Sequence, residues 1–314
     1  MQTQTIGKSD LTSTRLAYGC MRIAGGWDPA KVTAEDHARG RRAVIAAWEA
    51  GYRLFDHADI YCRGMCETIY GEAVREMPEL RKGALVATKC GVRFAGDPHP
   101  DSPQRYDFAA EHILRSAEGS LKRLGVERID LYQLHRPDFL MDPDEVAGAF
   151  KKLHRQGKVR WFGVSNFAPS MLTALASRRA QPLVANQVEI HLGRLDCFTD
   201  GTLHQCLAGQ ITPLSWSPLG RGLFATGGKV DPMNPKREGL EALLKLLDAT
   251  AAKYGISRTA LALAWLMRHP SHIIPIVGST DPEHIRDAAR ADDVQMDRED
   301  WYRILVAARM ERLP

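Results

Sequence analysis

The chain has 314 residues, of which 44% are hydrophobic and 25% are charged, and its formal net charge is +4. This length allows one large barrel or two ordinary domains, and the balance of residue types is globular. The small net charge is not concentrated in runs, which argues against nucleic acid and anionic membranes as partners. The N-terminus lacks the apolar core of a signal peptide, and no stretch reaches the length of a membrane span, so we expect a cytoplasmic protein.

Short apolar runs recur along the chain and alternate with amphipathic segments. The runs lack a clean alternation of apolar and polar residues, which is typical of parallel strands that are buried on both faces. We expect strands at residues 15–20, 53–56, 84–89, 129–135, 159–165, 183–188, 211–217 and 273–278.

The segments between these runs carry apolar residues at helical spacing, and several end at a glycine, as at Gly51, Gly125 and Gly157. We expect helices at residues 41–50, 67–76, 108–124, 144–156, 168–178, 202–208, 240–254, 259–268, 282–291 and 297–310. Strands that are each followed by a helix predict a (β/α)8 TIM barrel, with the last helix as an extra C-terminal element.

We therefore predict a single domain over residues 1–314, with a small N-terminal β-hairpin that turns at residues 7–10 beneath the barrel. The competing architecture is a doubly wound sheet, which usually carries a glycine fingerprint after its first strand. Residues 21–26 read MRIAGG and do not match G-x-G-x-x-G. The barrel is therefore favoured over the doubly wound sheet.

Two long loops, at residues 91–106 and 219–239, both follow strands. Loops of this length in compact domains are usually functional or disordered, and in a barrel both would lie at the catalytic mouth. The six cysteines are scattered, so free thiols are expected. Cys62 and Cys66 are four residues apart, but two further ligands at a matching spacing are missing, and no metal site is predicted.

Four reactive side chains lie at or just after successive strand ends, where barrel enzymes place their chemistry. Asp56 ends the second run, and Tyr61 follows five residues later. Lys89 ends the third run, and His135 ends the fourth. Each alone has an ordinary structural explanation, such as a helix cap or an ion pair. Their joint placement around one rim favours a functional role.

These residue types suit the reduction of a carbonyl group, which needs a hydride and a proton and builds negative charge on oxygen. Tyr61 can donate the proton, and Lys89 beside it would lower its pKa from the free value of about 10. Asp56 would keep Lys89 charged and oriented. His135 would donate a hydrogen bond to the substrate oxygen and stabilise its developing charge.

Amide and aromatic groups follow at the later strand ends. Asn166 and Gln187 can hydrogen-bond a nicotinamide carboxamide, and Trp216 offers a flat surface for the ring, although core packing also explains a tryptophan there. Backbone amides at residues 220–222 and 278–279 could bind a pyrophosphate, but such glycine turns are weak signals alone.

Seven stretches along nearly the whole chain together resemble the aldo-keto reductase superfamily: FDHADIY, ATKCG, LHRPD, KVRWFGVSNF, NQVEI, SWSPLGRG and IPIVGS. Their spacing is similar to that of the bacterial NADPH-dependent oxidoreductase branch. The resemblance implies a barrel that binds NADP(H) without a Rossmann fold, and a catalytic tetrad of Asp56, Tyr61, Lys89 and His135. The cofactor ligands that it implies are Ser165, Asn166 and Gln187 for the carboxamide, Trp216 for the ring, and Ser217, Leu219 and Gly222 for the pyrophosphate.

The sequence departs from the family where many members bind the adenosine 2′-phosphate with a lysine and an arginine. Those positions are Gly278 and His284 here, and the neighbouring Asp281 and Glu283 would repel a phosphate. The candidate ligands that remain are Ser279, Thr280 and a protonated His284. We expect NADP(H) to be favoured, with NAD(H) or dual use as the alternative.

Two other functions are weighed against an active reductase. The first is a cofactor-binding regulatory or scaffold protein with vestigial activity, which the intact tetrad argues against. The second is a metal-dependent hydrolase that uses His57 and Asp59, but DHAD does not provide a His-x-His pair. The predicted partner is a small carbonyl or alcohol substrate, and the protein is expected to be a monomer or a small homo-oligomer.

Overall fold

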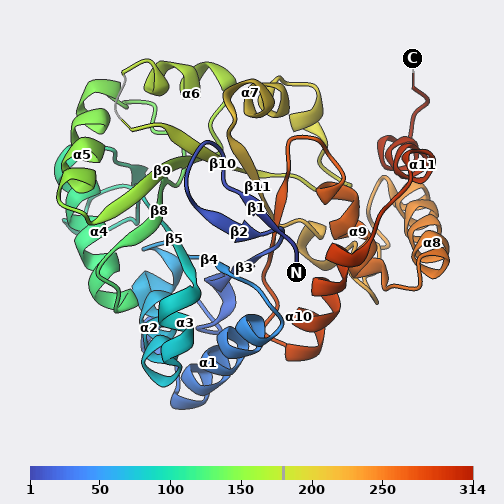
Figure 1. Cartoon of the computed structure of the whole chain (residues 1–314), viewed down its shortest axis with the longest axis horizontal. Coiled ribbons are helices and arrows are strands. Elements are labelled where there is room, and N and C mark those ends of the chain that lie inside the picture. The colour runs from blue at the N-terminus through green and yellow to red at the C-terminus, as the bar shows by residue number, and fades with distance from the viewer. Residues whose placement is uncertain (179–180, 314) are drawn as a thin grey trace.

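The computed structural model describes residues 1–178 and 181–313. Eight parallel strands in these residues form a closed barrel: β3 (Ala17–Gly19), β4 (Leu54–Asp56), β5 (Leu85–Cys90), β8 (Ile129–Leu134), β9 (Val159–Ser165), β10 (Leu183–Glu189), β11 (Thr212–Trp216) and β12 (Ile274–Val277). Strands that follow one another in this series pair in parallel, and β12 pairs with β3 to close the ring (Figure 1). The predicted (β/α)8 barrel is confirmed.

Helices form the outer layer around the strands, as Figure 1 shows. They are α1 (Ala34–Glu49), α2 (Met65–Glu76), α3 (Pro78–Gly83), α4 (Ala110–Leu124), α5 (Pro143–Arg155), α6 (Pro169–Ala176), α7 (Thr202–Gly209), α8 (Arg237–Lys253), α9 (Arg258–Met267), α10 (Pro282–Ala289) and α11 (Arg298–Arg309). The barrel strands are buried over most of their length because helices cover the outside and side chains fill the inside. This explains why their sequences are apolar runs rather than alternating patterns.

The first helix was predicted too short, because it begins at Ala34 rather than at residue 41. Thr33 and Asp36 form a capping box in which each side chain accepts a hydrogen bond from the other residue's backbone N–H. The first two turns are mostly polar, so the apolar spacing used to predict the helix does not extend to them. The short helix α3 was not predicted at all.

The N-terminal hairpin is present beneath the barrel, as predicted. Its strands are β1 (Thr3–Thr5) and β2 (Thr12–Thr14), which pair antiparallel and lie across the ring in Figure 1. Ile6 is fully buried and belongs to the apolar cluster at this end of the barrel. Gly7 has a φ of +54°, and a Cβ atom there would lie 2.5 Å from the carbonyl oxygen of Val184. The tight turn therefore requires glycine.

The predicted extra helix at the C-terminus is also present, as α11, and it lies beside α8 at one side of the molecule (Figure 1). Trp301 of α11 stacks on Trp265 of α9, with ring centroids 5.0 Å apart and an interplanar angle of 6°. Each indole N–H donates to the backbone carbonyl of the other residue at 3.0 Å. These contacts attach the C-terminal helix to the outer layer of the barrel.

Both long loops are ordered by arginine side chains. The loop at residues 91–106 holds a small antiparallel pair, β6 (Val92–Arg93) and β7 (Arg105–Tyr106). Arg93 forms ion pairs with Asp97 at 2.9 Å and with Asp107 at 2.7 Å. In the loop at residues 219–239, Arg258 donates to the carbonyl oxygens of Ala225 and Gly228.

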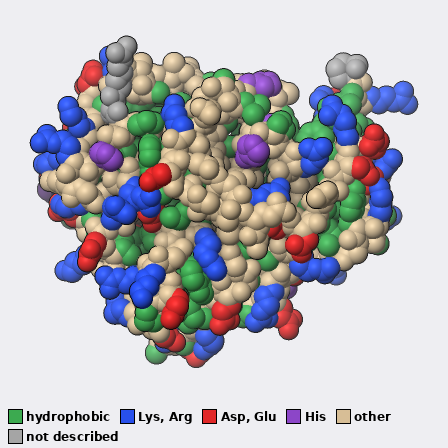
Figure 2. Space-filling view, in the orientation of Figure 1, with side chains coloured by type: hydrophobic (Ala, Val, Ile, Leu, Met, Phe, Trp, Pro, Cys, Tyr) green, Lys and Arg blue, Asp and Glu red, His purple; other side chains and the backbone are tan. Residues whose placement is uncertain are grey.

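Figure 2 shows basic and acidic side chains interspersed around the edge of the face on the hairpin side. The described helices include none with both the length and the apolar character needed to cross a bilayer.

Candidate active site

A buried ion pair links the ends of β4 and β5. The Lys89 ammonium donates to Asp56 Oδ2 at 2.8 Å, to the His57 carbonyl oxygen at 2.6 Å and to the Tyr61 hydroxyl at 3.3 Å. The side chains of Lys89 and Asp56 are 0% and 4% exposed. A buried ammonium is tolerated only when it is paired and fully hydrogen-bonded, and these three acceptors use all three N–H groups.

The backbone after β4 brings Tyr61 back over the barrel. The Tyr61 N–H donates to the Ala58 carbonyl oxygen at 3.1 Å, and the three residues that follow Tyr61 all have positive φ: Cys62 (+46°), Arg63 (+51°) and Gly64 (+88°). These left-handed residues reverse the chain before α2 begins. The segment after β4 therefore forms a tight turn, and the Tyr61 hydroxyl contacts Lys89 of β5.

His135, directly after β8, completes the cluster. Its ring makes an edge-to-face contact with the Tyr61 ring, with centroids 5.7 Å apart at 80°. Tyr61 is 8% exposed and His135 is 7% exposed, so both lie just beneath the surface. His135 Nδ1 is buried and has no hydrogen-bond partner in the described part of the chain. The structure thus brings together all four residues of the predicted tetrad.

The pKa values of these groups follow from burial and from the ion pair. Burial lowers the pKa of Lys89, but Asp56 and Tyr61 more than offset this, so the Lys89 pKa lies above its ordinary value. Burial, together with the cations of Lys89 and Arg136, holds the pKa of His135 well below its usual range. At neutral pH, Lys89 is therefore charged and His135 is neutral.

The expected lowering of the Tyr61 pKa is not found. Burial raises the pKa of Tyr61, Lys89 acts in the opposite direction, and the Asp56 carboxylate adds to the increase. The result is a pKa above the ordinary value, because loss of hydration outweighs one neighbouring ammonium. Tyr61 is consequently a protonated phenol throughout the neutral range.

Ser165, Asn166 and Gln187 lie at the ends of β9 and β10 and are hydrogen-bonded to one another. The Ser165 hydroxyl donates to the Gln187 carbonyl oxygen at 2.8 Å, and the Asn166 amide donates to the Ser165 oxygen at 2.8 Å. The Gln187 amide donates to Asp56 Oδ1 at 2.8 Å. The predicted carboxamide ligands thus connect directly to the buried ion pair, a contact that the sequence did not indicate.

Trp216, at the end of β11, lies beside these amides and is half-buried. Its indole N–H donates to Asn166 Oδ1 at 3.0 Å, which fixes the orientation of the ring. The guanidinium carbon of Arg136 is 5.2 Å from the Trp216 ring centroid. The tryptophan therefore offers a polar-anchored flat surface next to the tetrad, rather than a side chain enclosed in the core.

The predicted pyrophosphate segment is a tight turn after β11. Ser217, Gly220, Arg221 and Gly222 all have positive φ, and the Gly222 N–H donates to the Leu219 carbonyl oxygen at 3.0 Å. Apart from its own chain neighbours, no atom of the described residues lies within 4 Å of the position that a Cβ of Gly222 would occupy. Backbone approach to a ligand is therefore unobstructed here, which fits a loop that binds an extended phosphate group.

The predicted 2′-phosphate ligands lie after β12 and are more exposed. Gly278 is exposed, Ser279 and Thr280 are half-buried, and the His284 side chain is 72% exposed. His284 Nδ1 lies 3.5 Å from the Ser279 hydroxyl and 3.9 Å from Asp281. The backbone of this turn is fixed by a hydrogen bond from the Tyr18 hydroxyl to the Ser279 carbonyl oxygen at 2.9 Å, whereas the His284 side chain makes only these two long contacts.

The two residues proposed for a metal-dependent hydrolase, His57 and Asp59, lie in different surroundings. The His57 ring is fully buried and packs against Tyr70 with centroids 4.6 Å apart, whereas Asp59 lines a cavity outside the barrel. The part of the chain that the structure describes contains no group of three or more potential metal ligands. Cys62 and Cys66 are free thiols.

Two residues beside the tetrad were missed by the sequence analysis. Arg136 follows His135, and its charge acts on both His135 and Tyr61. Trp27 is 56% exposed and contacts the Tyr61 ring edge-on, with centroids 6.3 Å apart. Their only sequence signals were the position of Arg136 after a strand end and the position of Trp27 in the first βα loop.

The sequence model of the Aldo/keto reductase family matches residues 15–307. The chain belongs to the aldo/keto reductase family. It is similar to 6-dehydroglucose reductase of Novosphingobium aromaticivorans, with 38% identity over 98% of this chain and 96% of the relative. A protein of the same name from Agrobacterium fabrum is 36% identical over 97% of this chain and 98% of the relative.

Among solved structures, the glycerol dehydrogenase of Gluconobacter oxydans is similar to this chain with a TM-score of 0.86 and 28% identity, over 99% of this chain and 97% of the other. As a member of this family, the protein is an NAD(P)H-dependent oxidoreductase that reduces carbonyl groups by hydride transfer.

Proposed function

We propose that Tyr61 is the proton donor of this reductase and that Asp56, Lys89 and His135 are its catalytic partners. The observation that carries this proposal is the contact of the Tyr61 hydroxyl with Lys89 at 3.3 Å, with Asp56 on the other side of the ammonium and His135 against the phenol ring. In this arrangement a buried acid, a fixed cation and a neutral imidazole meet at the mouth of the barrel.

A nicotinamide cofactor, when bound, would supply the hydride for the carbonyl carbon. Tyr61 transfers its proton to the carbonyl oxygen, so an alcohol forms and a phenolate remains on Tyr61. Lys89, held charged by Asp56, stabilises that phenolate until it regains a proton from solvent. The neutral His135 ring donates a hydrogen bond to the same substrate oxygen while its negative charge develops.

The raised pKa of Tyr61 fits this role. An acid must be protonated before it can donate, and burial ensures this at neutral pH. Because burial raises the pKa of Tyr61, Lys89 matters most after the proton has left, when the phenolate would otherwise lie uncompensated in a dry site. Gln187 supports the same cluster by holding the second oxygen of Asp56.

We infer that the cofactor lies along the ends of β9 to β12. The proposed contacts are Ser165, Asn166 and Gln187 with the carboxamide, Trp216 with the ring, Ser217, Leu219 and Gly222 with the pyrophosphate, and Gly278, Ser279, Thr280 and His284 with the adenosine end. The open backbone at Gly222 and the anchored ring of Trp216 support this placement.

NADP(H) is proposed as the preferred form, with NAD(H) as a usable alternative. A cavity of about 370 Å³ beside Thr280 is also lined by Arg39 and Arg42 of α1, which the sequence analysis did not consider. Arg39 pairs with Asp36 at 2.6 Å and Arg42 with Glu35 at 2.8 Å, but each guanidinium group keeps further N–H donors that could bind an added phosphate.

The proposed substrates are small polyhydroxylated aldehydes or ketones. The support is that two relatives, similar over nearly their whole length, are named 6-dehydroglucose reductase and that the solved glycerol dehydrogenase is also similar. Trp27 and Arg136 beside Tyr61 provide an aromatic surface and a guanidinium group, which suit contact with a sugar-sized molecule.

The deciding experiment replaces Tyr61 with phenylalanine and follows NADPH oxidation with a panel of sugar aldehydes. We expect Tyr61→Phe to lose roughly 10²–10⁴-fold in kcat while it binds NADPH as tightly as the unchanged protein, because only the acid is removed. Tyr302→Phe on the outer helix α11 is the matched control and should keep full activity. Unchanged turnover in Tyr61→Phe would reject Tyr61 as the donor.

A further inference from the structure

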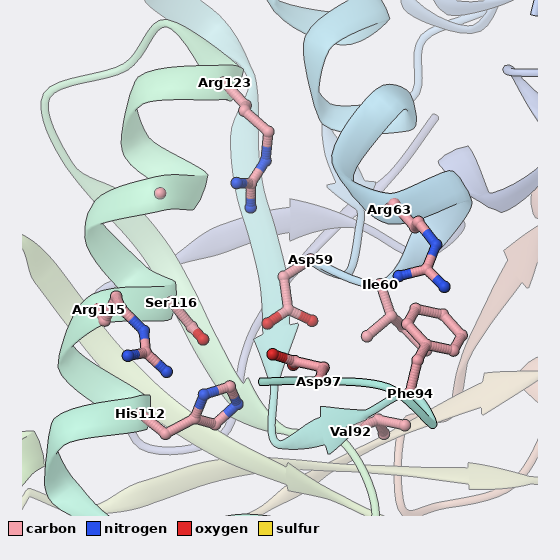
Figure 3. A pocket seen from close by; sticks show the side chains of 11 residues that line it. Asp59, Ile60, Arg63, Val92, Phe94, Asp97, His112, Arg115, Ser116 and Arg123 are labelled. Atoms are coloured by element: carbon pink, nitrogen blue, oxygen red, sulfur yellow. The ribbon is translucent and has the colours of Figure 1, made fainter. Parts of the chain in front are cut away.

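A second cavity lies outside the barrel, on the opposite side of the segment that carries Tyr61. It has a volume of about 320 Å³ and is bounded by the segment after β4, the loop after β5 and one side of α4. Figure 3 shows His112, Arg115 and Ser116 projecting from α4 toward Asp59, with Arg63 on the far side. None of these residues belongs to the proposed catalytic cluster.

Polar atoms on the wall of this cavity lack protein partners. Both ring nitrogens of His112 and one carboxyl oxygen of Asp59 are buried without a hydrogen bond in the described part of the chain. His112 is only 9% exposed, and burial lowers the pKa of its ring, which is therefore neutral. A buried polar group without a partner costs free energy, so these atoms indicate that a ligand or water completes the site.

The charge of the wall is predominantly positive. The carboxylate of Asp97 is already held by Arg93 through two hydrogen bonds, at 2.9 and 3.0 Å. Arg63 lies over the Phe94 ring at 4.5 Å and forms no ion pair with a described residue. Arg115 forms an ion pair with the exposed Glu111 at 3.4 Å through one N–H group, which leaves its other N–H groups uncommitted. Two guanidinium groups are thus available to an anion.

Asp59 would repel an anion if it were ionised, but burial and the nearby Glu67 raise its pKa to about 8. At neutral pH it is a carboxylic acid that can donate a hydrogen bond. The charged and titratable groups that surround it are Arg63 before α2, Glu67 on α2, Asp97 in the loop, and His112, Arg115 and Arg123 on α4.

Arg123 does not add a free charge, because it is paired with the fully buried Glu67 at 2.7 Å. That pair fixes the inner wall, and Glu67 also accepts a hydrogen bond from Thr88 at 2.6 Å. The remaining donors, two guanidinium groups, a neutral imidazole N–H and a protonated carboxyl, all suit oxygen atoms that carry negative charge.

We propose that this cavity is a binding site for a small oxyanion, either a phosphate ester or a carboxylate, separate from the mouth of the barrel. The ligand contacts Arg63 and Arg115 with its charged oxygens and reaches His112 and Asp59 with its inner oxygens. Arg63 and Asp59 flank the residues that position Tyr61, so the occupant lies directly behind the segment that carries the proposed acid.

Binding of this oxyanion is linked to the proton on Asp59. Below about pH 8 the carboxyl is neutral and the anion binds, whereas above it Asp59 ionises and repels the anion. One unit above that value the protonated fraction is about one tenth, so the affinity should fall roughly 10-fold for each further unit of pH. Asp59→Asn should bind the anion without this dependence.

The test is calorimetric titration of the whole protein with inorganic phosphate and, separately, with citrate, at constant ionic strength set with sodium chloride. We expect saturable binding of at least one probe at one site, and the comparison of the two distinguishes a phosphate-ester site from a carboxylate site. Arg115→Gln should weaken binding roughly 10-fold, because a charge-assisted hydrogen bond is lost. Lys122→Gln, on the exposed side of α4, is the matched control and should bind normally.

Several outcomes would overturn the proposal. Binding that does not saturate, or that Arg63→Gln and Arg115→Gln leave unchanged, would show that the cavity does not hold an anion. Equal affinity at about pH 7 and about pH 9 would remove the role of Asp59. Both arginine side chains are exposed, so these variants should fold, and the basal turnover of Arg115→Gln should equal that of the unchanged protein.

Discussion

The ends of β4 and β5 and the turn after β12 hold their polar side chains in opposite ways. At the first, Lys89 and Asp56 are buried and have every hydrogen bond satisfied, and Tyr61 packs against them. At the second, His284 is 72% exposed and its nearest polar contacts are 3.5 Å or longer. Charge interactions are strong where water is excluded and weak at the surface. The proposed catalytic cluster is therefore held by buried hydrogen bonds, whereas His284, a proposed cofactor contact, is held only weakly.

The largest effect is expected at the rigid end, from Lys89→Met. It leaves the Asp56 carboxylate buried without its cation, which should lower the free energy of unfolding by about 3–5 kcal/mol. Turnover should also fall roughly 10²–10⁴-fold, because the Tyr61 phenolate loses its counter-charge. Chemical denaturation and steady-state kinetics measure the two effects. Lys245→Met on the exposed side of α8 should change neither, and a stable, active Lys89→Met protein would remove the distinction between the two regions.

An intermediate effect is expected from Trp216→Ala, at the end of β11. Loss of the aromatic surface should weaken cofactor binding by up to roughly 10-fold and leave folding nearly intact, because the side chain is only half-buried. Fluorescence titration with NADPH and a thermal melt measure this pair. Trp27→Ala should leave cofactor affinity unchanged and raise the KM for the carbonyl substrate instead. A large drop in melting temperature with normal affinity would assign Trp216 to the core.

A smaller effect is expected at the exposed end, from His284→Ala. The KM for NADPH should rise only a few-fold, since exposed charge contacts contribute about 1 kcal/mol or less, and the KM for NADH should not change. Asp281→Asn should act in the opposite direction, because it removes a negative charge beside the proposed phosphate position. Steady-state kinetics with NADPH and with NADH measure the two KM values for each variant. A loss of NADPH use by 100-fold or more would show that this turn is as rigidly built as the tetrad.

The smallest effect is expected from pH on kcat for reduction between about pH 6 and about pH 9. Tyr61, the proposed donor, must be protonated to act, and burial raises its pKa, so it stays protonated over this range. The Lys89 pKa is also raised and the His135 pKa is lowered, so neither changes its charge there. Turnover at saturating substrate should therefore be level and decline only at more alkaline pH. A steep decline near pH 7 would show that the buried cluster titrates in solution.

Much of the fold could be predicted because its signals are local. Each buried parallel strand has its own apolar run, and helices such as 108–124 have their own apolar face and a terminal glycine. The errors occurred where the local signal is polar. The first turns of α1 are fixed by a capping box, and the short sheet in the loop at residues 91–106 is tied by ion pairs of Arg93.

The sequence indicated which side chains face the mouth, but it did not indicate how they are connected. The hydrogen bond from Gln187 to Asp56 joins residues 131 positions apart. The contacts of Arg136 with Trp216 and of Trp27 with Tyr61 likewise join separate βα loops. Contacts between residues so far apart in the chain cannot be predicted from periodicity or motifs, because they depend on how the closed barrel orients neighbouring strand ends.

The sequence by itself determined the alternation of strands and helices, and with it the rim on which Asp56, Tyr61, Lys89 and His135 lie, since both follow from local spacing and chain order. Only the tertiary structure decided the protonation states and the cavity behind Tyr61. Burial sets the cost of a charge, and burial depends on every element packed around a group. For that reason the pKa of Tyr61 is raised rather than lowered, and the pKa of Asp59 is raised to about 8.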